Sequence, residues 1–189
     1  MIEKNSVYSR LTMRKLTYEE ISCRRFTLQQ LRQEERFPIY VLLDNIRSLY
    51  NVGSIFRTAD GARIKKLFLG GYTPHPPRKE IEKTALGATH SVPWEYVQNP
   101  LPAIRNLKSQ GIRVAVLEHT DTSVPYYSLQ RDDFPLCLVV GNEITGVSKE
   151  IIAETDRAIE IPMYGMKQSL NAAVAFGIAV FEFVRIVSE

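Results

Sequence analysis

The stretch "IYVLLDNIRSLYNVGSIFRTADG", residues 39–61, joins two periodicities. Its beginning is a short run of β-branched and aliphatic residues, which is typical of a buried strand, and "NVGSIFRTADG" spaces its apolar residues as a helix does. A strand followed at once by a helix is the repeating unit of a parallel sheet. Similar pairs follow towards the C-terminus: strand patterns at 65–71, 112–118, 134–141 and 157–163, and helix patterns at 79–88, 100–111, 147–156 and 169–187. We therefore predict an α/β fold with a mostly parallel sheet flanked by helices.

The residues before this alternation have a different character. Residues 1–37 read as helical and charged, and Pro38 is expected to end them. We expect a basic helical extension, 1–37, followed by one domain, 38–189. The first 36 residues contain eight Lys and Arg against five Asp and Glu, and the rest contains sixteen of each. The excess indicates a polyanionic partner, although a solvated helical face explains the charge equally well.

Several classes of function are disfavoured by composition. The N-terminal residues lack the apolar centre of a secretory signal, and the longest apolar run, 172–181, is shorter than the ~20 residues of a membrane span. Two cysteines, Cys23 and Cys137, are too few for a disulfide framework or a metal cluster. We expect a cytoplasmic protein with no membrane role and no metal.

The last helix pattern is apolar on two faces. One face carries Ala173, Phe176, Val180, Phe183 and Val187, and the other carries Leu170, Val174, Ile178 and Phe181. A helix with so much apolar circumference needs two partners, the sheet and a second subunit. We therefore predict a homodimer; a helix sunk in the core is the alternative.

Polar side chains cluster just after the expected strands, where open parallel sheets bind ligands. Asn51 is expected to cap the helix that carries Arg57, so that both face one crevice, and Gly53 would allow a phosphate or cofactor to approach the backbone. An ordinary cap, a helix glycine and a surface arginine would give the same pattern.

Two later loops show the same enrichment. "GNEITGVS", 141–148, is a glycine-rich turn containing Glu143, but it lacks a P-loop lysine and the G-x-G-x-x-G spacing. Ser169 is expected to cap the last helix, with Asn171 pointing into the crevice. His119 is a possible base or an ordinary loop histidine, and Tyr126 and Tyr127 are possible base-stacking residues or packing residues.

Read together, three segments resemble the motifs of the SpoU/TrmH-type RNA 2'-O-ribose methyltransferases. They are "LDNIRSLYNVGSIFRTADG" (43–61), "LVVGNEITGVS" (138–148) and "IEIPMYGMKQSLNAAVA" (159–175), and "KTALGATHSVPW" (83–94) resembles a further family segment. The resemblance runs from about Ile39 to the C-terminus. It implies a SPOUT-type α/β knot, in which the chain from about Gly141 threads through an earlier loop, and a dimer.

The resemblance also implies roles for individual residues. The acceptor site would contain Asn51, Arg57, Glu143, Ser169 and Asn171. S-adenosylmethionine would be held by Leu117, Glu118, Gly141, Asn142, Ile161, Met163 and Leu170. We expect Arg57 to clamp an RNA phosphate and stabilise developing alkoxide charge, because guanidinium stays protonated in proteins. Glu143 or a phosphate oxygen would then receive the proton of the 2'-hydroxyl.

The expected partner is RNA, either tRNA or rRNA, and not DNA. Many relatives carry a separate RNA-binding domain, which 38 residues cannot form. RNA contacts are therefore expected from basic residues of the extension and of one loop: Arg14, Lys15, Arg24, Arg25 and Arg78. The resemblance implies tRNA in preference to rRNA, because tRNA enzymes of this type use short helical extensions.

Three rival functions remain at this stage. The first is a knotted methyltransferase that acts on a base nitrogen, which the Asn, Arg, Glu and Ser-Leu-Asn set disfavours. The second is a catalytically idle RNA-binding module, which retention of Arg57, Glu143 and Asn171 together disfavours. The third is a nucleotide-binding α/β regulator, which would bind ATP or NAD in place of the methyl donor.

Overall fold

The computed structural model describes residues 13–189, which divide into one compact unit ending at Glu34 and another spanning Glu35–Glu189. In the first unit, α1 (Tyr18–Ser22) and α2 (Leu28–Gln33) each begin at a threonine that is paired with the side chain three residues later in a capping box. The expected helical pattern up to Pro38 is wrong at its end: α2 stops at Gln33, and β1 (Phe37–Asp44) contains the proline. Residues 1–12 of the predicted extension lie outside the described residues.

The second unit is built on a seven-stranded sheet in the order β3-β2-β1-β6-β4-β7-β5, in which every neighbouring pair is parallel. The remaining strands are β2 (Ile64–Gly70), β3 (Trp94–Val97), β4 (Arg113–Leu117), β5 (Val124–Pro125), β6 (Leu136–Val140) and β7 (Arg157–Glu160). The five predicted strands are therefore present. β3 and β5 were not predicted, because these edge strands, of four and two residues, are too short to show a strand pattern.

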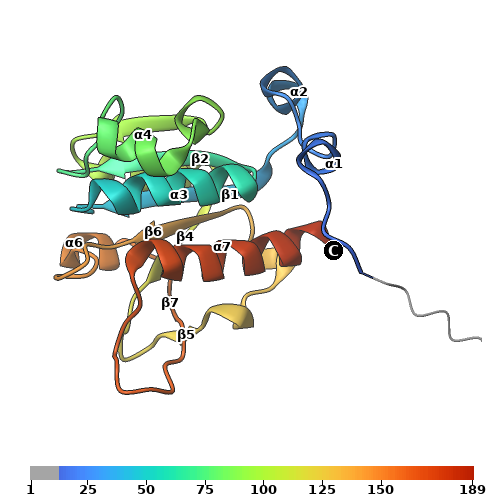
Figure 1. The fold of residues 1–189 in the computed structure, drawn as a ribbon. Helices are drawn as coiled ribbons and strands as arrows, with labels where there is room; N and C mark the ends of the chain where they lie inside the picture. The colour runs from blue at the N-terminus through green and yellow to red at the C-terminus, as the bar shows by residue number, and fades with distance from the viewer. Residues whose placement is uncertain (1–12) are drawn as a thin grey trace, which may run out of the picture. The chain divides into compact units, whose positions relative to one another are not determined.

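Helices cover both faces of this sheet (Figure 1). They are α3 (Leu49–Gly61), α4 (Lys79–Ala85), α5 (Pro100–Ser109), α6 (Lys149–Ile152) and α7 (Ala172–Ser188), with single 3-10 turns at Ala88–His90, Tyr126–Ser128 and Arg131–Asp133. Helix α7 is the longest and packs against α3. Among residues 13–189, no helix combines the length and the apolar character that crossing a bilayer requires.

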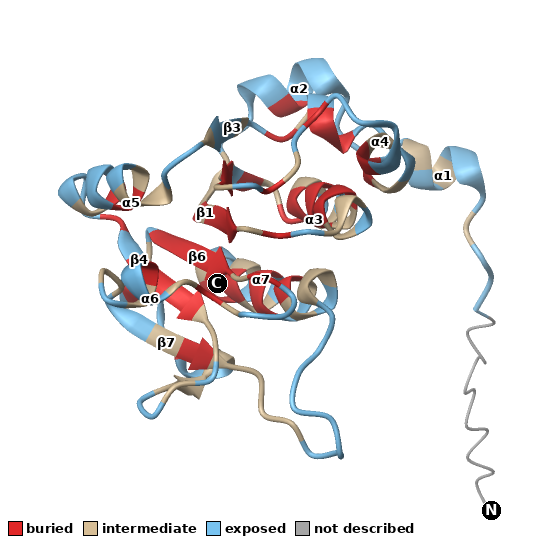
Figure 2. Cartoon of the chain, turned by 90° about the vertical axis from the view of Figure 1, so that its left-hand side faces the viewer, coloured by how far each residue is buried: buried red, intermediate tan, exposed pale blue. Residues whose placement is uncertain are grey.

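The central strands are buried, with helices on either side of them (Figure 2). Alternation of side chains along the strands produces two apolar layers. In β1, Ile39, Val41 and Leu43 face a core that includes side chains of α3, α4 and α7. Leu42 faces the opposite layer with α5 and α6. One of the two predicted apolar faces of α7 packs into this core, where Phe176, Val180 and Phe183 are fully buried.

The order in which the chain connects the strands determines where a ligand site can form. The chain runs outward from β1 through β2 to β3 and then crosses to β4 on the other side of β1, and β6 later enters between them. The boundary between β1 and β6 is therefore a point where the direction of winding changes, and ligands of open sheets bind at the carboxyl ends of strands near such points. The loops after β1, β4, β6 and β7 all start at this edge.

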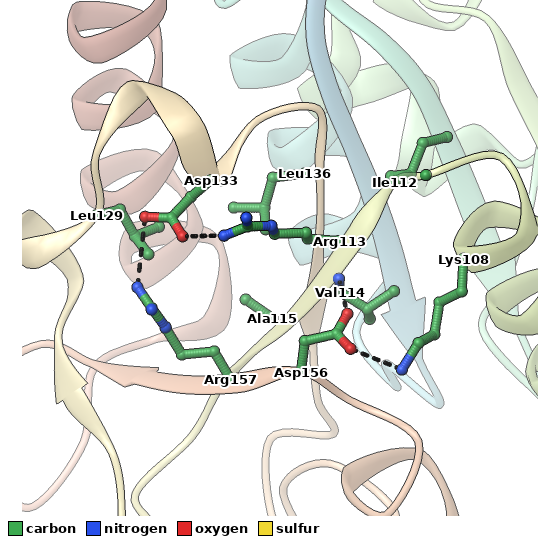
Figure 3. Close-up of a pocket in the computed structure, with 11 residues that line it drawn as sticks. Lys108, Ile112, Arg113, Val114, Ala115, Leu129, Asp133, Leu136, Asp156 and Arg157 are labelled. Carbon is green, nitrogen blue, oxygen red and sulfur yellow. Dashed lines mark hydrogen bonds and ion pairs between the residues drawn. The ribbon is translucent and has the colours of Figure 1, made fainter.

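At the opposite, amino-terminal edge, Asp133 ties two strands together (Figure 3). Its carboxylate accepts hydrogen bonds from Nη1 of Arg113 at 2.7 Å and from Nη1 of Arg157 at 3.3 Å, and its side chain is 9% exposed. Asp156 pairs nearby with Nζ of Lys108 at 2.7 Å. These residues line a cavity of about 340 Å³. Because both carboxylates are paired with cations, we assign them to holding the starts of β4 and β7.

Replacing Asp133 with Asn should lower the free energy of unfolding by about 2 kcal/mol, because two arginines then lose their shared counter-charge in a largely buried position. Denaturant unfolding at neutral pH measures the change. Asp132→Asn is the matched control, since Asp132 is exposed and makes no ion pair within the described chain. Equal stabilities of the two variants would contradict the assignment.

Candidate active site

A cavity of about 390 Å³ lies at the carboxyl edge of the sheet, and we call it the carboxyl-edge cavity. Its walls come from the loops after β4, β6 and β7 and from the start of α7, and its volume is in the range of small-molecule sites. Every residue predicted to hold the cofactor lies in these walls: Leu117, Glu118, Gly141, Asn142, Ile161, Met163 and Leu170. The structure thus brings together four distant segments, and the binding roles of these residues stay predictions.

The turn after β6 is closed tightly by glycines. A Cβ added to Gly141 would lie 2.3 Å from the backbone nitrogen of Val147, and Gly146 has a φ of +69°. The carboxylate of Glu118 accepts hydrogen bonds from the N–H groups of Val147 and His119, both at 3.0 Å. The loops after β4 and β6 are therefore fastened to each other along the cavity wall.

A chain of side-chain hydrogen bonds, which we call the polar cluster, joins Glu143, Asn51 and Asn171. Nδ2 of Asn51 donates to Oε1 of Glu143 at 2.9 Å, and Nδ2 of Asn171 donates to Oδ1 of Asn51 at 3.0 Å. Oδ1 of Asn171 accepts from the backbone of Ala173 at 2.9 Å. Each amide nitrogen thus donates to an acceptor, and each amide oxygen accepts from a donor. The cluster links the first turn of α3 and the loop after β6 to the start of α7.

Glu143 is the acceptor at the end of the cluster. Besides Asn51, it accepts hydrogen bonds from the N–H groups of Arg47 at 2.9 Å and Ser48 at 3.0 Å. Partial burial raises the pKa of the Glu143 carboxyl, but these donors outweigh it and hold the pKa below the ordinary value. The carboxylate is therefore ionised and engaged, which suits it to hold loops in place more than to collect a proton.

Two predicted helix caps are wrong. Helix α3 begins after Ser48, whose hydroxyl accepts from the backbone of Asn51, so Asn51 lies inside the helix with its side chain free to join the polar cluster. Helix α7 is capped by Asn171, whose oxygen also accepts from Val174 at 3.3 Å. Ser169 is exposed in the cavity wall and makes no hydrogen bond within the described chain. In both cases a neighbouring polar residue had the better geometry for the cap.

Two further expectations for α3 fail. Arg57 is exposed and lies outside the cavity wall, on α3 about 120° around the helix from Asn51. It makes no hydrogen bond or ion pair with the residues that the structure describes. Gly53 lies against α4 and not at a ligand site. A Cβ at this position would lie 2.1 Å from Oγ1 of Thr84 and 2.3 Å from the carbonyl oxygen of Ile81, so the glycine allows α3 and α4 to pack closely.

His119 has a structural setting that the sequence left open. Its Nδ1 lies 3.2 Å from a carboxylate oxygen of Glu160, and its Nε2 lies 3.1 Å from the carbonyl of Gln168. The ring therefore bridges the loop after β4, the end of β7 and the loop before α7. The hydroxyl of Ser123 and the His119 ring together hold the pKa of Glu160 below its ordinary value.

The sequence analysis missed two residues that support the site. Asp44 is buried at the end of β1, where it accepts hydrogen bonds from the N–H of Ser148 at 2.7 Å and from Nδ2 of Asn45 at 2.8 Å. The carbonyl of Asn45 accepts from Nδ2 of Asn142 at 2.7 Å. The sequence feature that could have predicted this role is an acidic residue, Asp44, at the end of an otherwise apolar strand.

The basic residues predicted to bind RNA are exposed: Arg14, Lys15, Arg24, Arg25 and Arg78. Arg14 is engaged within its own unit, where it pairs with Glu20 at 2.6 Å. Within residues 13–189, no three His, Cys, Asp or Glu side chains converge in an arrangement that could hold a metal ion.

Comparison with known proteins points to one family. The model of the SpoU rRNA methylase family matches residues 38–181. A tRNA (guanosine(18)-2'-O)-methyltransferase from Aquifex aeolicus is 33% identical over 84% of this chain and 74% of its own length. The crystal structure of an A. aeolicus TrmH/SpoU tRNA modifying enzyme is 34% identical, with a TM-score of 0.76 over 85% of this chain and 82% of that one.

A second solved structure carries a ligand. The AdoMet-bound rRNA methyltransferase from Sinorhizobium meliloti is 33% identical, with a TM-score of 0.74 over 82% of this chain. The present chain spans 59% of the length of that protein and 63% of the length of curated staphylococcal relatives. The likeness supports the mostly parallel α/β fold, whereas the expected knot concerns the path of the chain and stays a prediction.

Replacing Glu143 with Gln should make the free energy of unfolding depend less on pH in the acidic range. A carboxyl whose pKa is lowered on folding contributes stability above its unfolded pKa and loses it as pH falls through the lowered value. We expect wild-type stability to decline from about pH 5 downwards, and Glu143→Gln to decline less and to be about 1 kcal/mol less stable at pH 7. Denaturant unfolding at several pH values measures both.

The control is Glu80→Gln, because Glu80 is exposed and makes no side-chain hydrogen bond within the described residues. It should keep the wild-type pH profile. A wild-type profile for Glu143→Gln as well would show that the polar cluster contributes nothing to folding.

Proposed function

The chain belongs to the SpoU rRNA methylase family, and from this premise we propose that it transfers the methyl group of S-adenosylmethionine to a ribose 2'-hydroxyl of tRNA or rRNA. One observation carries the proposal. The polar cluster and the carboxyl-edge cavity share Glu143 and Asn171, so a place for the donor and a set of groups for the acceptor are adjacent.

The cavity suits the methyl donor. Leu117, Ile161 and Leu170 provide apolar walls for an adenine ring, and the turn from Gly141 to Gly146 provides backbone polar groups without side chains in the way. When bound, the donor supplies an electrophilic methyl group on a sulfonium. The residues of this chain then have to orient a hydroxyl and manage one proton.

The cluster favours one proton acceptor over another. Glu143 already accepts three hydrogen bonds and has a lowered pKa, so we assign it to positioning Asn51 and the loop after β1. This leaves a phosphate oxygen of the RNA to receive the proton. Arg57, exposed and without a partner among the described residues, is assigned to hold that phosphate and not the cofactor, which agrees with its position outside the cavity wall.

RNA binding is assigned to the exposed cations Arg14, Lys15, Arg24, Arg25 and Arg78, which would contact phosphates without reading sequence. We favour tRNA over rRNA as the substrate, because a relative 33% identical to this chain is a tRNA (guanosine(18)-2'-O)-methyltransferase. We also assign the protein to the cytoplasm, where these RNAs occur; its two cysteines, Cys23 and Cys137, are both free thiols, as expected in a reducing compartment.

A homodimer is the proposed working form. The second face of α7, formed by Val174, Ile178 and Phe181, is exposed in the single chain, and Phe181 is 52% exposed. Leu170, predicted to extend this face, precedes the helix and lies in the cavity wall. A row of apolar residues along one helix face is a typical subunit contact. Two copies that bury this row would remove it from water without disturbing the core.

We expect methyl transfer from radiolabelled S-adenosylmethionine to bulk tRNA or rRNA, with 2'-O-methylnucleoside as the product after digestion. Arg57→Lys should lower kcat/KM at least tenfold, because an ammonium cannot make a bidentate contact with phosphate. Arg105→Lys is the matched control, since Arg105 lies on α5, at the other face of the sheet, and pairs with Glu154 at 2.6 Å.

Other outcomes separate the rival functions. A base-methylated product would assign the chain to base nitrogen chemistry. Calorimetric binding of S-adenosylmethionine without transfer to either RNA would favour an RNA-binding module, and binding of ATP or NAD in its place would favour a regulator. Near-normal turnover of Arg57→Lys would contradict the phosphate clamp.

Replacing Phe181 with Glu should convert the dimer to a monomer, because a charge would be buried without a partner at the subunit contact. Light scattering after gel filtration measures the mass at micromolar concentration. Leu86→Glu changes an exposed apolar residue directly after α4 and should leave the dimer intact. A wild-type chain that elutes as a monomer would end the dimer proposal.

A further inference from the structure

Tyr72 is an exposed aromatic residue that is nevertheless held at both ends. It follows β2 and is 62% exposed. Its backbone N–H donates to Oδ1 of Asn45 at 3.1 Å, and its phenol oxygen accepts from Nδ2 of Asn142 at 2.7 Å. Single exposed aromatic residues are common, but most have a free ring that rotates with its side chain. Here the ring direction is determined by two contacts.

The turn that carries Tyr72 is also fixed. The hydroxyl of buried Thr73 donates to the carbonyl of Leu43 at 3.2 Å and accepts from the N–H of Ile46 at 3.0 Å. On the other side, the hydroxyl of Tyr96 donates to the carbonyl of Gly71 at 2.9 Å. A ring on such a turn loses little freedom when something binds to it, which increases the affinity it can contribute.

The anchor of the ring belongs to the proposed site. Asn142 is 6% exposed, lines the carboxyl-edge cavity and directly precedes Glu143 of the polar cluster. Its oxygen is used by the N–H groups of Ile144 and Thr145, so its amide nitrogen has to point towards Tyr72. The phenol is therefore one side chain away from the cavity, while the ring lies outside the cavity wall.

We propose that the exposed Tyr72 ring stacks on a base of the RNA beside the reacting ribose, with Asn142 fixing the ring relative to the cavity. This inference rests on the proposed function, because it deepens how the same site takes its substrate. Unpaired RNA bases are commonly recognised by stacking on aromatic side chains, and stacking tolerates any base. Tyr72 thus positions the nucleoside, while the cations hold the phosphates.

Tyr127 is the matched comparison. It is a tyrosine of similar exposure, 52%, but its ring already packs edge-to-face on Tyr126 at a centroid distance of 5.3 Å. No hydrogen bond joins its hydroxyl to the described residues. Tyr127→Leu should therefore leave RNA binding unchanged.

The test uses the full chain with bulk tRNA, bulk rRNA and S-adenosylmethionine. Tyr72→Leu should raise the Kd and KM for the RNA that binds about tenfold, the range expected for one stacked base, with the Kd for S-adenosylmethionine within about twofold of wild type. Tyr72→Phe keeps the ring and loses the tether, so about a threefold rise is expected. Tyr72→Trp keeps a stacking ring but, like Phe, cannot accept the Asn142 hydrogen bond, so its Kd for RNA should lie within about threefold of wild type. Its added fluorescence should be quenched by RNA beyond any change in Trp94.

Three results would overturn the inference: RNA affinity of Tyr72→Leu within twofold of wild type, an equal loss of RNA and S-adenosylmethionine affinity, or no rescue and no quenching with Tyr72→Trp. The second would assign Tyr72 to the cofactor loop. If the wild type binds RNA but transfers no methyl group, the proposed function fails, and the binding and quenching measurements still decide whether the ring stacks.

Discussion

The carboxylate of Glu143 holds the loop after β1 against the loop after β6, and the arrangement of the site depends on this contact. Two backbone N–H groups and the Asn51 amide converge on it, and Asn51 passes the constraint to Asn171 and the start of α7. A charged acceptor strengthens each of these hydrogen bonds relative to a neutral one. The charge of Glu143 therefore helps to fix three chain segments relative to one another. In sequence, Glu143 lies 92 residues and Asn171 lies 120 residues after Asn51.

The parallel sheet makes such a contact possible. All seven strands point in one direction, so their loops emerge at one edge, and β6 lies between β1 and β4 although it enters the sheet late. The edge that receives the polar cluster also receives the cavity wall. The opposite edge contains Asp133 between two arginines, where the charges are satisfied internally.

Among the described residues, the site offers groups that can orient a substrate, and its acids are held by hydrogen bonds within the chain. Its acids are engaged: Glu118 by two backbone N–H groups, Glu143 by three donors and Glu160 by Ser123 and His119. This pattern agrees with a reaction in which the donor is already activated and the protein supplies alignment. In the same way, the tyrosine, amide and arginine side chains proposed to act on RNA would hold and orient it and would not transfer a proton.

Much of the secondary structure could be predicted from the spacing of apolar residues along the sequence. Periodicity predicted the α/β class and five of the strands, because buried parallel strands and amphipathic helices have distinct apolar spacing. The motif residues were found as polar groups following strands, and family resemblance supplied their order. Local pattern failed at caps, where Ser48 and Asn171 displaced Asn51 and Ser169, because adjacent polar residues compete for the same N–H groups and only backbone geometry selects among them.

The sequence by itself determined the fold class, the apolar faces of α7 and the set of polar residues at the strand ends, because each depends on neighbours in the chain. Tertiary structure alone decided which of them meet. It joined Asn51 to Glu143 and Asn171, turned Arg57 away, assigned Gly53 to helix packing and tethered Tyr72 to Asn142. These outcomes depend on strand order and on distances between residues far apart in sequence, and such long-range geometry arises only when the sheet assembles.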